Sequence, residues 1–94
     1  MTFTKRLHGP IMRGEVTCSV RIWHSPRVKV GGCYSLEHGH VRVTRIRQME
    51  LADITPDLAR RSGFAGVVDL LKTAKHGCGR NVYLIDFVFE EKAA

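Results

Sequence analysis

Residues 81–89 read NVYLIDFVF, a long and mostly apolar run of residues that favour β-structure. A run of this kind is typical of a strand that is buried on both faces. Glu90, Glu91 and Lys92 follow it and are expected to lie in solvent. The run therefore predicts a closing strand that passes through the core of the protein.

Residues 16–23, VTCSVRIW, predict a second strand because β-branched and aromatic side chains dominate it. Successive side chains of a strand point to opposite faces. This alternation gives an apolar row and a mixed row, which consist of Cys18, Val20 and Ile22, and of Thr17, Ser19, Arg21 and Trp23. The mixed row aligns a hydroxyl, a guanidinium and an indole on one face.

The middle of the chain predicts a loop followed by a hairpin. Residues 24–32, HSPRVKVGG, carry two cations and end in a pair of glycines, which is typical of a loop. His38-Gly39 then predicts a tight turn in which glycine supplies the positive φ. This turn would join strands over residues 33–37 and 40–51.

The N-terminal residues predict a strand-like segment. Residues 2–8 alternate imperfectly between apolar and polar side chains, and Gly9-Pro10 ends the pattern. Residues 11–13 then predict a single helical turn before the second strand.

Two short helices are predicted before the closing strand. Thr55 suits an N-cap position and Pro56 suits the first helical position, and the helix is expected to end around Ser62. Residues 65–77, AGVVDLLKTAKHG, have apolar side chains at helical spacing, and Gly77 is the expected C-cap.

The order of these elements predicts a single α+β domain over residues 1–94. The expected architecture is a small mixed or antiparallel β-barrel with two or three short helices. No apolar run approaches the roughly 20 residues of a membrane span, and the N-terminal residues lack the apolar region of a secretory signal. We therefore expect a cytoplasmic protein without a membrane partner, as a monomer or weak dimer.

Composition favours an anionic partner and no metal. The formal net charge is +6, which favours polyanions, although small domains also carry such a charge for solubility. The three cysteines form no CxxC pair, so neither a zinc site nor a disulfide framework is expected. His38 and His40 lack a third ligand nearby, and no cofactor is expected.

Several stretches together resemble an ASCH domain of the PUA-like superfamily. Residues 14–21, GEVTCSVR, stand at the family's Gly-x-Lys-x-x-Thr-x-Arg motif, and Val30-Gly31-Gly32 stands at its Gly-Asp step. The resemblance continues through residues 49–55 and the closing strand. It implies a PUA-like barrel with a cleft beside the motif strand and a link to RNA. One bacterial branch of the family hydrolyses the acetyl amide of N4-acetylcytidine.

The residues of that hydrolase branch are mostly replaced here. Val16 stands at the position of the motif lysine, Ser19 at that of the threonine, and Ser62 near that of a helical glutamate, while Arg21 is unchanged. A serine hydroxyl needs a base within hydrogen-bond reach, which valine cannot supply. His24 is the nearest candidate base, so Ser19 and His24 are the candidate catalytic residues, but we do not expect the amidohydrolase activity.

The mixed row of the second strand is the candidate binding site. A guanidinium at Arg21 would bind a phosphate or a base edge with two hydrogen bonds, and Trp23 would stack on a base. Ser19 would line the same cleft. The alternatives are a structural ion pair for Arg21 and a core position for Trp23.

Five further cations are candidate phosphate contacts, namely Arg27, Lys29, Arg42, Arg45 and Arg47. Strand alternation separates Arg42 from Arg45 and Arg47. The apolar alternation breaks near Thr44, however, and a β-bulge there would restore all three to one face. The alternative is a solvated strand face without a ligand.

The leading hypothesis is a non-enzymatic module that binds RNA or a nucleotide. The alternatives are a hydrolase of a modified nucleoside or a ribonuclease with a rearranged active site, and a protein-interaction domain that retains only the fold.

Overall fold

The computed structural model describes residues 2–74 and 80–91 of the chain. Within them the elements follow the order α1 (Lys5–Met12), β1 (Cys18–Trp23), β2 (Cys33–Leu36), β3 (Gly39–Met49), the 3-10 turn η1 (Leu51–Asp53), α2 (Pro56–Arg61), α3 (Val67–Ala74) and β4 (Asn81–Glu91). None of the helices in these residues is both long and apolar enough to cross a bilayer.

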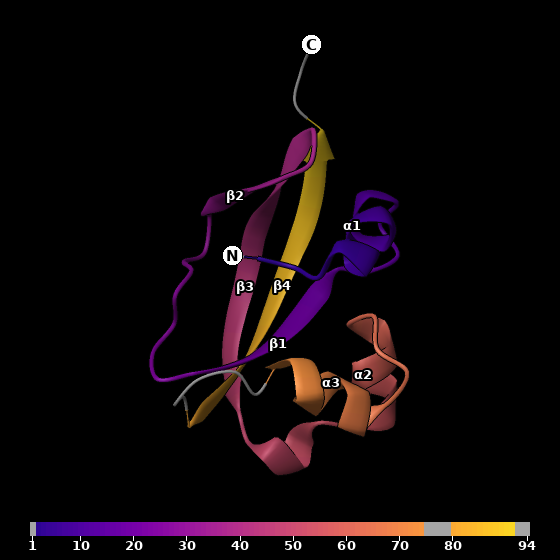
Figure 1. Cartoon of the computed structure of the whole chain (residues 1–94). Helices are drawn as coiled ribbons and strands as arrows, with labels where there is room; N and C mark the ends of the chain where they lie inside the picture. The colour runs from indigo at the N-terminus through magenta and orange to yellow at the C-terminus, as the bar shows by residue number, and fades with distance from the viewer. Residues whose placement is uncertain (1, 75–79, 92–94) are drawn as a thin grey trace.

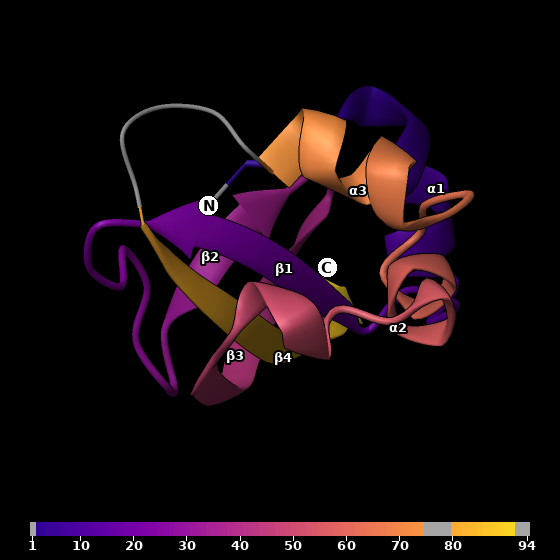
Figure 2. The same ribbon diagram turned by 90° about the horizontal axis from the view of Figure 1, so that it is seen from below.

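The four strands form one antiparallel sheet in the order β1-β4-β3-β2. The sheet curls into a half-barrel, and the three helices gather on the side of the molecule where β1 lies (Figures 1 and 2). The prediction of a small α+β, barrel-like fold with short helices is thereby confirmed.

Strand β4 passes through the core, as the run 81–89 predicts. Val82 and Leu84 pack in the larger core cluster with apolar residues of the helices. Tyr83 and Ile85 point to the opposite face and pack in a second cluster with Val43. These four side chains are all buried, which confirms that this part of β4 is enclosed on both faces of the sheet.

The predicted strand over residues 2–8 is wrong, because residues 5–12 form helix α1, which also contains residues 11 and 12 of the predicted helical turn. Phe3, Leu7 and Ile11 recur every four residues, and Leu7 and Ile11 are both buried on one face of the helix. Pro10 lies inside the helix and removes one backbone donor. Burial of the Leu7–Ile11 face outweighs this loss, so the proline does not break the helix.

The β2–β3 hairpin exists, but its turn differs from the prediction. Leu36 pairs with Gly39, so the turn residues are Glu37 and His38. Glu37 has the positive φ, at 53°, whereas Gly39 is the first residue of β3. A Cβ at Gly39 would collide with the Glu90 carbonyl and lie 2.6 Å from the Phe89 ring. Glycine is therefore required by the close approach of β4 and not by the turn.

The bulge expected in β3 is confirmed. The register with β4 shifts between Val43 and Arg45, which leaves Thr44 as the extra residue. On either side of it, Arg42, Arg45 and Arg47 pair with alternate residues of β4 (Val88, Asp86 and Leu84). The three arginines therefore lie on one face of the sheet.

Helix α2 begins as predicted. The Thr55 hydroxyl accepts a hydrogen bond from the backbone N–H of Leu58, and Pro56 is the first helical residue. The second predicted helix is α3, for which the structure gives residues 67–74. The expected C-cap, Gly77, lies outside the described residues.

Candidate functional site

A cleft of about 390 Å³ lies beside strand β1. Its residues come from the N-terminal segment and α1, from β1, from the loop after β1, and from the region of α3. They are Thr2, Phe3, Thr4, Leu7, Ser19, Val20, Arg21, Trp23, Arg27, Phe64, Thr73 and Ala74. Segments about 50 to 70 positions apart in sequence therefore meet around one cavity.

The floor of the cleft includes the mixed row that strand alternation predicts. Ser19, Arg21 and Trp23 pair in register with Ile85, Tyr83 and Asn81, which are alternate residues of β4. Residues paired in this way lie on the same face of a sheet. The structure thus brings the three candidate residues together and places Arg27, one of the predicted phosphate contacts, in the same cleft.

Arg21 is held in place by three uncharged partners. Its Nε donates to the Ser19 hydroxyl at 2.8 Å, and its Nη2 donates to the Thr2 carbonyl at 2.6 Å. The guanidinium also stacks over the Phe3 ring, with Cζ 5.0 Å from the ring centroid. These contacts fix the orientation of the side chain without neutralising its charge.

The positive charge of the cleft is uncompensated within the described residues. Burial lowers the pKa of the half-buried Arg21 from its ordinary value, which indicates that the guanidinium has lost part of its hydration. Neither Arg21 nor Arg27 takes part in an ion pair that the structure describes. The described lining also contains no carboxylate. The cleft therefore favours an anion.

Trp23 stands at a second, adjoining hollow of about 250 Å³. This hollow is lined by Thr2, Arg21, Trp23, Arg27 and Val28, so it shares four residues with the larger cleft. The indole is half-buried and packs against Tyr83, with ring centroids 6.3 Å apart. Part of the indole surface, which lines both hollows, is thus open to a ligand.

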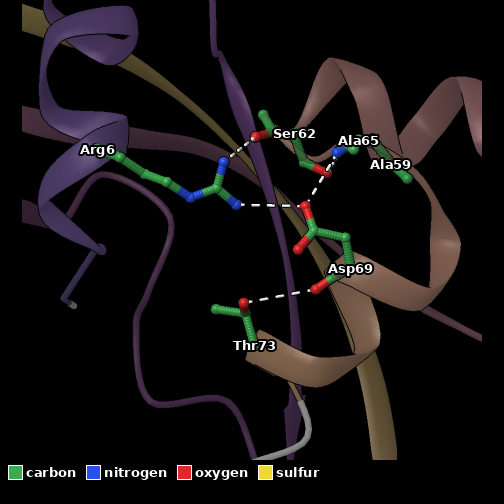
Figure 3. Close-up of polar contacts among 7 residues, drawn as sticks. Arg6, Ala59, Ser62, Ala65, Asp69 and Thr73 are labelled. Atoms are coloured by element: carbon green, nitrogen blue, oxygen red, sulfur yellow. Dashed lines mark hydrogen bonds and ion pairs between the residues drawn. The ribbon is translucent and has the colours of Figure 1, made fainter.

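Arg6 of α1 makes contacts that hold together elements on the other side of the cleft, and Figure 3 shows its polar partners. Its guanidinium donates to the Gly63 carbonyl and to the Asp69 carboxylate, both at 3.4 Å. It also lies over the ring of Phe64, 5.1 Å from the centroid. Asp69 in turn accepts from the backbone N–H of Ala65 before α3. These contacts tie α1 to α3, which both contribute cleft residues.

The arginine row of β3 belongs to a different surface. Arg45 pairs with Asp86 of β4, whereas Arg21 pairs with Tyr83, so the two lie on opposite faces of the sheet. Arg42 contacts Glu90 at 3.1 Å and Arg47 contacts Asp86 at 3.7 Å, which offsets part of their charge. The structure therefore separates these predicted phosphate contacts from the cleft.

Lys29 does not line the cleft either. Its backbone N–H donates to the hydroxyl of Tyr34 at 3.1 Å, which fastens the loop to β2. Of the cations in the loop 24–32, the structure brings Arg27 to the cleft and leaves Lys29 exposed outside it.

The candidate catalytic pair is not assembled. Ser19 is 8% exposed, and its hydroxyl accepts from Arg21. His24 is exposed, its carbonyl accepts from Asn81, and the hydrogen bonds of the described residues include none between His24 and Ser19. Five residues of extended chain span roughly 16 Å, which is far beyond hydrogen-bond reach.

The other two positions of the hydrolase branch have packing roles. Val16 is buried at 6% exposure in the larger core cluster. Ser62 is 1% exposed, and its hydroxyl donates to the carbonyls of Leu58 and Ala59 at the end of α2. Neither side chain is available to a ligand in the cleft.

Sequence reasoning missed the residues that come from the N-terminal segment, α1 and α3. Phe3 and Leu7 were expected in a strand, and Phe64 and Thr73 were not expected near β1. The recurrence of Phe3, Leu7 and Ile11 at every fourth position is the signal that could have revealed α1.

Within the described residues, no group of three or more potential metal ligands comes together.

Comparisons with models of protein families, with curated proteins and with solved structures found no match. The resemblance to the ASCH family thus rests on the stretches of sequence quoted above and stays a prediction.

Proposed function

We propose that the protein is a non-enzymatic module that binds a nucleotide, free or within RNA, in the cleft beside β1. The observation that carries this proposal is the guanidinium of Arg21, which is fixed by uncharged partners, partly dehydrated and next to an accessible indole.

Arg21 supports the phosphate part of the proposal. A partly dehydrated cation without a carboxylate gains more from an incoming anion than a fully hydrated one does. Guanidinium groups bind phosphate oxygens with paired hydrogen bonds. Since Nε and Nη2 already have partners, Nη1 is the nitrogen with no described partner of its own. Arg27 supplies a second cation to the same cleft.

Trp23 supports the nucleoside part. Stacking of a base on an aromatic side chain contributes about 1–3 kcal/mol, and it tolerates any base because every base has a π-face. Trp23 and Arg21 lie two positions apart on one strand, or roughly 7 Å. A ligand that joins a ring to a phosphate over a similar distance satisfies both side chains.

The absence of a catalytic arrangement within the described residues supports binding over hydrolysis. The Ser19 hydroxyl accepts from Arg21, and no carboxylate or histidine among the described residues lines the cleft to act as its base. The family resemblance and the net charge of +6 favour the same class of ligand. The proposal includes a cytoplasmic location, because nucleotides are plentiful there and because Cys18 and Cys33, the cysteines that the structure describes, are free thiols. It also includes a monomer or weak dimer.

The intrinsic fluorescence of Trp23 provides the test, since this is the protein's one tryptophan. Nucleoside monophosphates and short single-stranded RNA should quench it upon titration. Arg21→Ala should weaken binding about 10–100-fold, which corresponds to the loss of a charge-assisted contact of roughly 1.5–3 kcal/mol. Arg21→Lys keeps the charge but not the paired hydrogen bonds, so its affinity should lie between that of Arg21→Ala and that of the unmodified protein.

Arg60→Ala is the matched control, because it removes the same charge from an exposed position of α2 outside the cleft. It should leave the affinity within about twofold of the unmodified protein. Equal losses in Arg21→Ala and Arg60→Ala, with both variants folded by circular dichroism, would show diffuse charge attraction and contradict binding in the cleft.

A further inference from the structure

The cleft and its adjoining hollow differ in the chemistry of their walls. The larger part extends from the arginines to an apolar wall, which includes Leu7 of α1 and Phe64 before α3. The smaller hollow lacks that wall and is formed around Arg21, Arg27 and Trp23. A ligand that occupies both must therefore be apolar or aromatic at one end and anionic at the other.

From this division we infer that the ligand unit is a nucleoside monophosphate, with its base stacked on Trp23 in the larger part and its phosphate between Arg21 and Arg27. This inference rests on the proposed function and deepens it by assigning an orientation to the ligand. It also makes Arg27 the residue that recognises the phosphate together with Arg21.

Arg27 suits this role because of its position at both hollows and because its charge has no ion-pair partner in the described residues. It lies in the loop after β1, lines both hollows, and takes part in no ion pair that the structure describes. Arg21, by contrast, is oriented by Ser19 and Thr2. One fixed guanidinium and one exposed guanidinium in a loop can enclose a phosphate from two sides.

The larger part suits a nucleobase because it combines apolar walls with hydroxyl groups. Leu7 and Phe64 offer apolar surface, while Thr4 and Thr73 bring hydroxyls from α1 and α3. Thr4 occupies the N-cap of α1, but its side chain makes no capping hydrogen bond, so the hydroxyl is available to a ligand. A volume of about 390 Å³ lies in the range of sites for one small molecule.

The experiment compares ligands with and without a phosphate by the quenching of Trp23 fluorescence. The probes are the four 5′-ribonucleoside monophosphates, the matching nucleosides, and trinucleotides with a 5′-phosphate or a 5′-hydroxyl. The unmodified protein should bind the phosphorylated member of a pair at least tenfold more tightly. Arg27→Ala should remove most of this preference, so that its affinity for a monophosphate falls close to its affinity for the matching nucleoside.

Arg60→Ala again serves as the control and should keep the tenfold preference. If the monophosphates bind more tightly than the nucleosides, a free nucleotide is sufficient as the ligand. If only the 5′-phosphorylated trinucleotides bind more tightly than their 5′-hydroxyl forms, the ligand is a phosphorylated RNA end. Either result supports the phosphate site. Equal binding of nucleosides and monophosphates, with Arg27→Ala equal to the control, would overturn the orientation.

That overturning result is distinct from a failure of the proposed function. If Arg21→Ala still weakens RNA binding while the phosphate preference is absent, the cleft binds nucleotides in another orientation. If no nucleotide, nucleoside or RNA changes Trp23 fluorescence and none binds by calorimetry, both the function and the orientation are wrong.

Discussion

Replacement of Phe3 by leucine tests whether the N-terminal segment orients Arg21. Leucine keeps apolar bulk at this half-buried position but removes two aromatic contacts. The ring of Phe3 lies 5.4 Å from that of Phe87, and the guanidinium of Arg21 lies 5.0 Å above it. An aromatic pair contributes about 0.5–1.5 kcal/mol, and a cation–π contact at a partly exposed site about 0.5–1 kcal/mol. Phe3→Leu should therefore lower the free energy of unfolding by about 1–2.5 kcal/mol.

The assay is urea unfolding of Phe3→Leu, Arg21→Met and the double variant, followed by far-ultraviolet circular dichroism. Because Phe3 and Arg21 are in contact, the losses should not add. The double variant should be more stable than the sum of the single changes predicts, by about 0.5–1 kcal/mol. For a domain of this size, a change of 1 kcal/mol also shifts the Tm by roughly 4–8 °C.

The reasoning is refuted if Phe3→Leu costs less than about 0.5 kcal/mol and the two changes add within about 0.3 kcal/mol. Such a result would mean that the N-terminal segment does not hold the guanidinium in solution. Arg21 would then keep only its hydrogen bond to Ser19, and the proposed fixed anion site would lose the contacts from the N-terminal segment.

Three further predictions concern the fold and its titratable groups. Gly39→Ala should cost about 1–3 kcal/mol in urea unfolding because its Cβ would meet the backbone of β4, and a neutral effect would contradict the close approach. The hydrogen bond between His8 and Glu37 and the one from Arg42 to Glu90 hold the pKa of each carboxyl below its usual range. The unfolded chain therefore binds more protons in acid, so stability should fall as the pH drops below the ordinary glutamate pKa of about 4.3 and toward the lower pKa of the folded state. Melts between pH 3 and 7 that show no such fall would be inconsistent with these contacts. Burial raises the pKa of the Cys18 thiol, so iodoacetamide should label exposed Cys33 and spare Cys18 in the native protein, as peptide mass spectrometry would show.

The strands could be predicted because their side-chain patterns are local. The apolar run of β4, the alternation of β1 and the break near Thr44 each reflect burial over a few neighbouring positions. Helix α1 was missed because Gly9-Pro10 suggests an end of structure, whereas tertiary burial of Leu7 and Ile11 stabilises a helix through that point. Tertiary packing thus overrides the local preference of these two residues.

The site could be predicted only on the β1 side. The alternation of side chains along a strand predicts that Ser19, Arg21 and Trp23 share one face. Contacts such as that between Arg6 and Asp69, however, join residues 63 positions apart. No local pattern encodes which helix will face a strand. Sequence reasoning also groups Arg27 with the arginines of residues 42–47 as phosphate contacts. The pairing of β3 with β4 instead places the row that contains Arg45 on the face opposite Arg21.

The most direct measurement of the central claim is a two-dimensional ¹H–¹⁵N NMR titration of the labelled protein with nucleoside monophosphates and short RNA. If the cleft is the binding site, the shifts will concentrate on Arg21, on the indole N–H of Trp23 and on Phe64 across the cavity. Shifts confined to Arg45 and Arg47 on the other face, with Trp23 unchanged, would contradict the claim.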